Sequence, residues 1–379
     1  MGKPARQNAC LFGLILILLY GRGVSAAPGQ PPYPNHLSEW QVFVRNPDGS
    51  LELSEGVFPY ELVNPLFSDY AVKFRFVRLP RGQAARYREK GPFVFPVGTV
   101  LGKTFAYPAD SVGFPDEGGG SSAGVVARGP MKVLNSHRLV ETRLLVKTDN
   151  GWIGLPYVWN QAQSEASLAL IGVKIPVSLT HPESGTVSFS YRVPNFNQCK
   201  GCHIIREGFS KSVVPIGPRA AYLNKNFRYP EGLFNQLSYW SSRDLLRGLP
   251  EKPSPAPPRW DDPAAPLDAR ARAYLDINCA HCHNPKGPAA YSGLFLDQED
   301  RDPVSYGVCK SPVASGTGSG GRQFDIVPGH PEQSILHYRL GSGDPGEMMP
   351  ELGRSLAHVK GLELIYSWIA GMDGSCGNG

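Results

Sequence analysis

The chain has 379 residues, 41% of them hydrophobic, and a formal net charge of +5. This length and composition indicate a globular protein of two or three domains and exclude a chain that is disordered throughout. Part of the positive charge comes from Lys3, Arg6 and Arg22 near the start, so the charge does not indicate a nucleic-acid partner.

Residues 1–26 predict a secretory signal peptide. Lys3 and Arg6 precede the apolar run from Ala9 to Tyr20, and Val24-Ser25-Ala26 fits a small-residue cleavage site. The run is too short for a comfortable membrane span, although an uncleaved anchor is the alternative. We therefore expect a periplasmic or secreted protein with no stable membrane span after cleavage.

Residues 27–195 predict a β-rich, sandwich-like domain, because short β-branched and aromatic runs alternate with turn residues. Arg138 to Lys147 and Trp152 to Trp159 predict a hairpin around Asn150-Gly151. The other expected strands are Val72 to Leu79, Phe93 to Tyr107, Ser167 to Leu179 and Thr186 to Val193.

A C-x-x-C-H motif follows the last expected strand, as Cys199, Cys202 and His203, and recurs as Cys279, Cys282 and His283. This motif attaches a c-type haem: each cysteine forms a thioether with the porphyrin, and the histidine is the proximal iron ligand. With 7 Cys and 9 His in 379 residues, chance gives only about 0.003 matches per chain. The sequence thus predicts two covalent haem c groups.

Two other uses of paired cysteines are less consistent with the spacing. The halves of a zinc site usually lie about 15–20 residues apart, whereas these motifs begin 80 residues apart (279 minus 199). A dithiol redox site does not require a histidine directly after both pairs.

The first haem lacks an obvious distal ligand. Residues 196–249, the expected first haem-binding segment, contain short helical patterns but no methionine or histidine after His203. The candidates are His181, His137 and Met131 in the β-rich domain, and the alternative is an iron open to a small molecule.

The proline-rich residues 250–266 predict a stiff linker, and residues 267–379 an all-α, cytochrome c-like domain. A helix from Leu267 to Ile277 would lead into Cys279, and a closing helix would carry Leu362 and Ile365. We expect these two helices to pack together. The whole chain would thus be an α+β multidomain protein with a haem-bearing helical and loop extension between its two main domains.

Met349 is the preferred distal ligand of the second haem, since it lies 66 residues after His283 (349 minus 283) and precedes Pro350. Met348, His330 and His337 are alternatives. The loop 284–288 would supply the carbonyl that orients His283, and His281 would face solvent.

Cys309 and Cys376 remain after the haem cysteines and Cys10, which lies in the predicted signal, are set aside. An oxidising compartment favours a disulfide between them, and two free thiols are the alternative.

The mature chain resembles a family of exported bacterial two-haem cytochromes c, most of them uncharacterised. The resemblance covers most of the length and implies haem binding and electron transfer, without a substrate. Besides the haem motifs it rests on several short segments: Glu141 to Leu145, Trp152 to Asn160, Val193 to Asn195, Pro215 to Pro218, Asn235 to Leu237, Ile326 to Gly329 and Met349 to Gly353.

Three hypotheses follow. The first is a periplasmic electron-transfer protein that exchanges electrons with redox partner proteins. The second is an enzyme, peroxidase-like or oxidising a small molecule, that uses an open first haem. The third, compatible with the first, makes the β-rich domain a docking module for a redox partner.

Overall fold

A computed structural model describes residues 2, 33–109, 132–181, 185–300, 302–313 and 316–377. From Asn35 onward they belong to one compact unit. The helices are α1 (Lys132–Ser136), α2 (Gln198–His203), α3 (Ala220–Leu223), α4 (Gln236–Ser242), α5 (Leu267–Leu275), α6 (Ile335–Gly341) and α7 (Val359–Ala370). The strands are β1 (Phe43–Arg45), β2 (Leu51–Leu53), β3 (Val57–Tyr60), β4 (Val72–Arg78), β5 (Ala85–Arg86), β6 (Val100–Pro108), β7 (His137–Thr148), β8 (Gly151–Trp159), β9 (Ala166–Leu168), β10 (Val173–His181), β11 (Gly185–Val193), β12 (Ile204–Glu207), β13 (Ser210–Val213), β14 (Asn226–Tyr229), β15 (Gly232–Asn235) and β16 (Leu246–Arg247).

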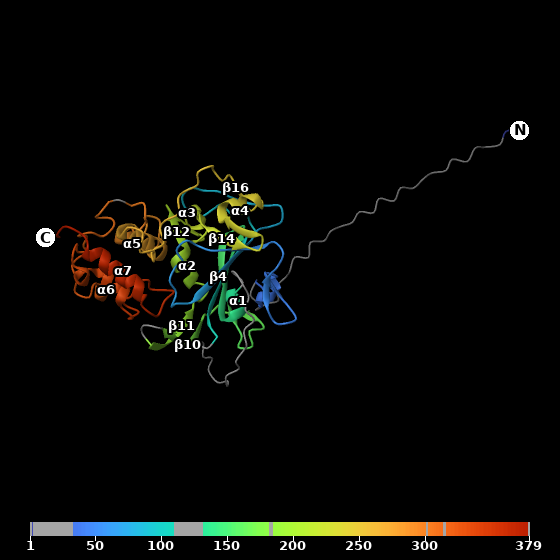
Figure 1. The fold of residues 1–379 in the computed structure, drawn as a ribbon, viewed down its shortest axis with the longest axis horizontal. Helices are drawn as coiled ribbons and strands as arrows, with labels where there is room; N and C mark the ends of the chain where they lie inside the picture. The colour runs from blue at the N-terminus through green and yellow to red at the C-terminus, as the bar shows by residue number, and fades with distance from the viewer. Residues whose placement is uncertain are drawn as a thin grey trace. The chain divides into compact units, whose positions relative to one another are not determined.

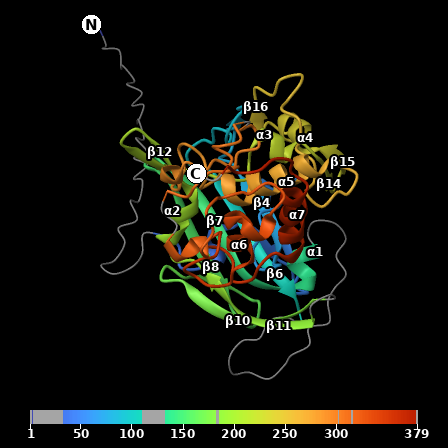
Figure 2. The ribbon, with the colours of Figure 1, turned by 90° about the vertical axis from the view of Figure 1, so that its left-hand side faces the viewer.

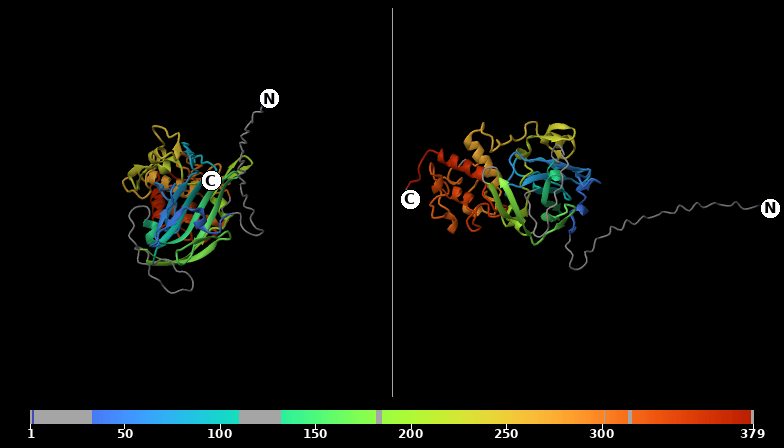
Figure 3. Two further views of the ribbon diagram at one scale, coloured as in Figure 1. Left: turned by 90° about the vertical axis from the view of Figure 1, so that its right-hand side faces the viewer. Right: turned by 60° about the horizontal axis from the view of Figure 1, so that its bottom comes forward.

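A six-stranded antiparallel sheet in the order β3-β4-β6-β7-β8-β9 forms the centre of the fold (Figures 1 and 3). The predicted hairpin around Asn150-Gly151 is confirmed: β7 and β8 pair from Glu141–Val158 to Thr148–Gly151. Gly151 has a φ of 110°, a conformation that residues with a Cβ atom rarely adopt. The chain is therefore β-rich, as predicted, but the described residues form one six-stranded sheet with two-stranded hairpins instead of the expected sandwich of two sheets.

Two apolar clusters cover parts of this sheet. The β10–β11 hairpin packs on β6 and β7, with the rings of Tyr191 and Phe105 6.2 Å apart; Figure 2 shows it along the lower border of the sheet. In the second cluster, the ring of Trp240 on α4 contacts that of Tyr60 on β3 edge-to-face, with their centres 5.7 Å apart. Burying large aromatic side chains on a sheet is a main source of its stability.

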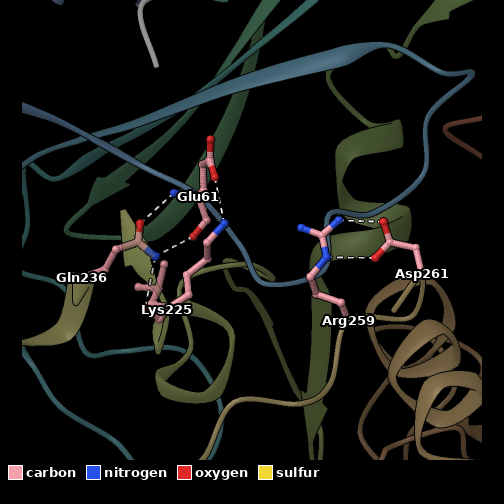
Figure 4. A network of polar contacts seen from close by, with 6 residues as sticks. Glu61, Lys225, Gln236, Arg259 and Asp261 are labelled. Carbon is pink, nitrogen blue, oxygen red and sulfur yellow. Dashed lines mark hydrogen bonds and ion pairs between the residues drawn. The ribbon is translucent and has the colours of Figure 1, made fainter. Parts of the chain in front are cut away.

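A buried amide fixes the segment between the motifs to the sheet region (Figure 4). The Gln236 side chain accepts a hydrogen bond from the Glu61 backbone N–H at 2.8 Å and donates to the Glu61 carbonyl at 2.9 Å and to the Leu223 carbonyl at 3.1 Å. Lys225 pairs with the Glu61 carboxylate at 2.8 Å, and Arg259 pairs with Asp261 at 2.6 Å. Gln236 thus satisfies backbone groups of two distant segments.

The prediction of an all-α, cytochrome c-like domain over 267–379 is wrong. Its α-helices in the described residues are α5, α6 and α7, of only 9, 7 and 12 residues (Figure 1). The rest is turns and irregular structure, within the same compact unit as the sheet. The two end helices have the apolar period of a helix, but the Gly- and Pro-rich chain between them cannot continue it.

Those end helices do pack together as expected. Leu275 of α5 and Ile365 of α7 share one buried cluster, and Leu362 is partly buried against it. Gly361 permits the contact, because a Cβ atom there would lie 2.3 Å from the Tyr274 hydroxyl.

The proline-rich segment 250–266 contacts the region before it. Asn64 donates to the Pro258 carbonyl at 2.8 Å and accepts from the Trp260 N–H at 3.0 Å. Within the described ranges, no helix combines the length and hydropathy required to cross a membrane. The predicted signal peptide, Cys10 and Met131 lie outside those ranges.

Candidate functional site

The two C-x-x-C-H motifs lie on different elements. Cys199, Cys202 and His203 occupy the short helix α2, between the β10–β11 hairpin and β12. Cys279 lies within a π-helical turn, Asp276–Ala280, that directly continues α5. Cys279 is buried, whereas the other three motif cysteines are partly exposed.

Both histidines that end the motifs are held through Nδ1. The Nδ1 of His203 lies 2.7 Å from the Val214 carbonyl, and the Nδ1 of His283 lies 3.5 Å from the Ser292 hydroxyl. Burial lowers the pKa of each imidazole to about 4, so both are neutral at pH 7. A neutral imidazole tied through Nδ1 keeps Nε2 available to a metal. The groups that face the His283 ring come from residues 292–294 rather than from the predicted loop 284–288.

The fold brings the motifs into contact with each other. The ligand atoms of Cys202, Cys282 and His281 all lie within 4.8 Å of one another. The Cys282 thiol approaches the Gly201 carbonyl at 3.7 Å. Hydrogen bonds with Cys282 and then His281 lower the pKa of Cys202 against the opposing effect of burial. Residues 80 positions apart in the sequence therefore meet at one point.

The segments that follow the motifs are also joined. The Arg206 N–H on β12 donates to the Lys286 carbonyl at 2.7 Å, and the Lys286 ammonium pairs with Glu207 at 2.7 Å. That ion pair is exposed, so it contributes little to stability, but the backbone bond fixes how the β12–β13 hairpin lies beside the second motif.

A cavity adjoins the second motif. Cys279, Cys282, His283 and Met349 line it, together with apolar side chains such as Leu336. Its volume, including the open mouth, is about 1320 Å³. Met348 is 1% exposed and does not line the cavity. The structure thus places Met349, rather than its neighbour, where it faces the same space as His283.

Neither histidine offered as an alternative to Met349 lines this cavity. The ring of His337 lies 5.4 Å from that of Tyr366, and His330 lies 3.5 Å from the Glu332 carboxylate. The predicted disulfide is confirmed: Cys309 is bonded to Cys376.

The distal candidates for the first motif are not brought to it. His181 ends β10 at the turn of the β10–β11 hairpin, while Val173 at the other end pairs with Val193, which precedes the motif. Eight residues of strand separate these ends, a distance of roughly 26 Å at about 3.3 Å per residue. His137 begins β7, with its Nδ1 2.9 Å from the Ser136 hydroxyl.

The prediction that His281 faces solvent is wrong. It is 7% exposed, not solvent-facing, and it lines the cavity beside the second motif. Its Nδ1 is buried and makes no hydrogen bond in the described part of the chain. Since a buried imidazole nitrogen without a partner is unfavourable, this atom indicates that a further group belongs beside it.

These residues fit haem better than zinc. Cys202, Cys282 and His281 provide three ligand atoms. These are too few for a structural zinc site, which uses four, and would suit only a catalytic zinc with an open fourth position. Zinc at this point would also give no role to the Nδ1 bonds of His203 and His283. An apolar cavity with two cysteines, a tied histidine and a methionine matches the donor set of a c-type haem.

No protein-family model, curated protein or solved structure matches the chain.

Proposed function

We propose that the protein transfers electrons through two covalent haems, one held by Cys199, Cys202 and His203 and the other by Cys279, Cys282, His283 and Met349. Haem supplies a one-electron couple on iron, whose potential the axial ligands tune. The Met349 thioether would raise the potential of the second centre.

The contact between the two motifs is the observation that carries this proposal. In a haem c the cysteine sulfurs bond to the rim of the porphyrin. Because the sulfurs of Cys202 and Cys282 lie within 4.8 Å of each other, these residues would bring two porphyrin rims together. Electron tunnelling falls steeply with the distance between rims, so the pair would exchange electrons quickly.

The proposal extends to the compartment. Haem attachment by this motif in bacteria takes place outside the cytoplasm, and the disulfide Cys309–Cys376 is of a kind that persists in oxidising compartments. We include in the proposal that residues 1–26 direct export and that the partners are periplasmic redox proteins.

The experiment is to produce the full chain in a host that matures cytochromes c and to count covalent haems by mass spectrometry and pyridine haemochrome. We expect two haems per chain, and one each in the variants Cys199→Ala/Cys202→Ala and Cys279→Ala/Cys282→Ala. Zinc without haem in the purified protein would contradict the proposal.

Carbon monoxide then separates a carrier from a catalyst. After reduction with dithionite, a carrier with both irons six-coordinate leaves the Soret band unchanged when carbon monoxide is added. Rapid binding at one haem would favour the alternative function, a haem enzyme with an open first iron.

Interaction between the haem spins in the electron paramagnetic resonance spectrum would test directly whether the two haems lie close together.

A further inference from the structure

Four cationic side chains lie together on one face of the central sheet. Arg75 on β4 is directly opposite Lys103 on β6, which is directly opposite Arg143 on β7. Lys73 lies two residues from Arg75 on the same face. Like charges directly opposite each other destabilise a sheet. We call Lys73, Arg75, Lys103 and Arg143 the cationic row.

One member of the row has a full partner. The guanidinium of Arg143 donates to Glu141, with its Nε 2.9 Å from a carboxylate oxygen, and the Tyr191 hydroxyl donates to the same carboxylate at 2.5 Å. Glu141 is fully buried. The carboxylate is therefore committed to Arg143 and Tyr191.

The remaining cations are poorly compensated. Arg75 is 7% exposed, and its guanidinium makes no hydrogen bond or ion pair with any residue that the structure describes. The Lys103 ammonium lies 4.7 Å from the centre of the Phe105 ring, with no acceptor among those residues. Lys73 donates to the Ala71 carbonyl at 3.1 Å.

Two more carboxylates lie near the row and raise the pKa of one of its members each. Asp69 lies near Lys73, but it accepts backbone hydrogen bonds from Ser355 at 2.6 Å and Leu356 at 2.8 Å. Glu61 lies near Arg75 and is paired with Lys225. Both are thus occupied by other donors.

The pKa values show how unfavourable the charges are in this arrangement. Burial lowers the pKa of Lys103 to about 7, and the charges of Arg143 and Arg75 lower it further than Glu141 raises it. Burial also lowers the pKa of Arg75. Neighbouring cations with few acceptors around them are unfavourable. The nitrogens of Arg75 and Lys103 are not among the enclosed, unpartnered atoms, so an anion that reaches them would offset this energy.

The row adjoins the first motif. A Cβ atom at Gly154 on β8, the strand next to β7, would lie 3.0 Å from the Cys199 sulfur. The charge of Arg143 lowers the pKa of Cys199, and that of Lys103 lowers the pKa of His203. Cys202 in turn raises the pKa of Lys103. A group held by α2 would therefore lie within reach of the cations.

We propose that the cationic row is an oxyanion-binding site in which Arg75 and Lys103 donate to a carboxylate or a similar small oxyanion. Arg143 borders this site but does not donate to the anion, because it is paired with Glu141. The anion has two possible sources. One is a diffusible oxyanion; the other, which rests on the proposed function, is a propionate of the first haem.

The test compares the haem-loaded full chain with Arg75→Gln and the matched control Arg75→Lys. Thermal midpoints are measured against sodium sulfate, with sodium chloride at equal ionic strength as the reference. A diffusible oxyanion predicts a saturable rise of the midpoint in wild type. Arg75→Gln should weaken the apparent affinity roughly tenfold or more, since it removes a charge-assisted hydrogen bond, and Arg75→Lys should retain most of it.

A bound propionate predicts a different pattern. Sulfate then has no saturable effect, but Arg75→Gln lowers the midpoint potential of one haem, because a nearby cation favours the reduced state, and Arg75→Lys restores it. If Arg75→Gln does not fold, Lys103→Gln and its control Lys103→Arg are compared by the same two measurements.

Two results would overturn the proposed oxyanion site. One is an equal effect of sulfate on wild type and Arg75→Gln, which is the general stabilisation by an excluded salt. The other is no sulfate effect together with unchanged potentials of both haems. If haem counting finds no haem, the proposed function fails on its own, and the sulfate titration of the full chain alone decides the oxyanion site.

Discussion

Arg354 fixes the loop that carries Met349. It is 5% exposed and donates to four backbone carbonyls: that of Met349 at 3.0 Å, and those of Arg339, Ser342 and Leu356 at 2.9, 3.0 and 3.2 Å. A planar guanidinium can serve several acceptors at fixed angles, which a lysine ammonium cannot.

We expect Arg354→Lys to loosen this loop while keeping the charge. The fold should lose roughly 2 to 4 kcal/mol, since buried carbonyls lose charged donors, and the proposed second haem should lose part of its thioether-to-iron absorption band. Urea unfolding and near-infrared spectra measure the two effects. An unaltered band with reduced stability would mean that Arg354 stabilises the fold without positioning Met349.

Met349 itself is tested by Met349→Ala, with Met348→Leu as the matched control. Loss of the proposed thioether ligand should lower the potential of the proposed second haem and abolish its charge-transfer band. Met348→Leu changes a buried side chain of similar volume, so it should leave both unchanged. Equal potentials in wild type and Met349→Ala would contradict the assignment of Met349 as an iron ligand.

At the scale of elements, a buried carboxylate joins α3 to the turn before Cys279. Asp276 accepts a hydrogen bond from the Tyr222 hydroxyl and one from the Gln298 N–H at 3.4 Å. Burial raises the pKa of Asp276, although Arg219 and Tyr222 act in the opposite direction and Asp297 in the same one. The folded state therefore retains a proton that the unfolded chain releases.

This shift gives a pH dependence of definite sign. Below the ordinary pKa of 3.8 the stabilisation from the protonated Asp276 is fully present, and it is lost as the pH rises through the raised folded value. We expect Asp276→Asn to gain stability relative to wild type as the pH rises from about 4. Urea midpoints of both proteins across this range check it; a constant difference would contradict the assignment.

Elements set by neighbouring residues could be predicted from the sequence. The Asn150-Gly151 turn placed β7 and β8 correctly, and the apolar period located α5 and α7. Gly172, with a φ of 77°, divides the expected strand 167–179 into β9 and β10. The expected strand 93–107 starts only at Val100, because residues 92–99 form isolated bridges and turns.

At the scale of the whole molecule, the disulfide joins the C-terminal segment to the loop beside Ile326. The Cys309 N–H also donates to the Ile326 carbonyl at 2.9 Å. The two cysteines are 67 residues apart, so chain entropy predicts a stabilisation of roughly 4 kcal/mol.

We expect Cys309→Ser/Cys376→Ser to lose much of this stability. Calorimetry or urea unfolding of the double variant measures it, and wild type under reducing conditions serves as the comparison. A midpoint that does not change would show that the closed loop adds little to the fold.

The motif residues and the Cys309–Cys376 pair could be read from the sequence, but their arrangement could not. Nothing in the local pattern indicates that Cys202 meets Cys282, since this contact depends on how the β12–β13 hairpin lies against residues 284–288. The burial of His281 has the same origin. The cationic row could not be predicted, because strand register, rather than sequence spacing, places Arg75 beside Lys103.

If the proposed haems are attached, the closeness of Cys202 and Cys282 and the burial of Cys279, which is 8% exposed, would also set an order of assembly. Once α5 has packed against α7, an attaching enzyme could no longer reach Cys279, and two neighbouring thiols exposed to an oxidant could form a cross-link between the motifs. Haem attachment would then have to precede folding. The chain would have to be modified while it is still unfolded, before its native contacts bury Cys279.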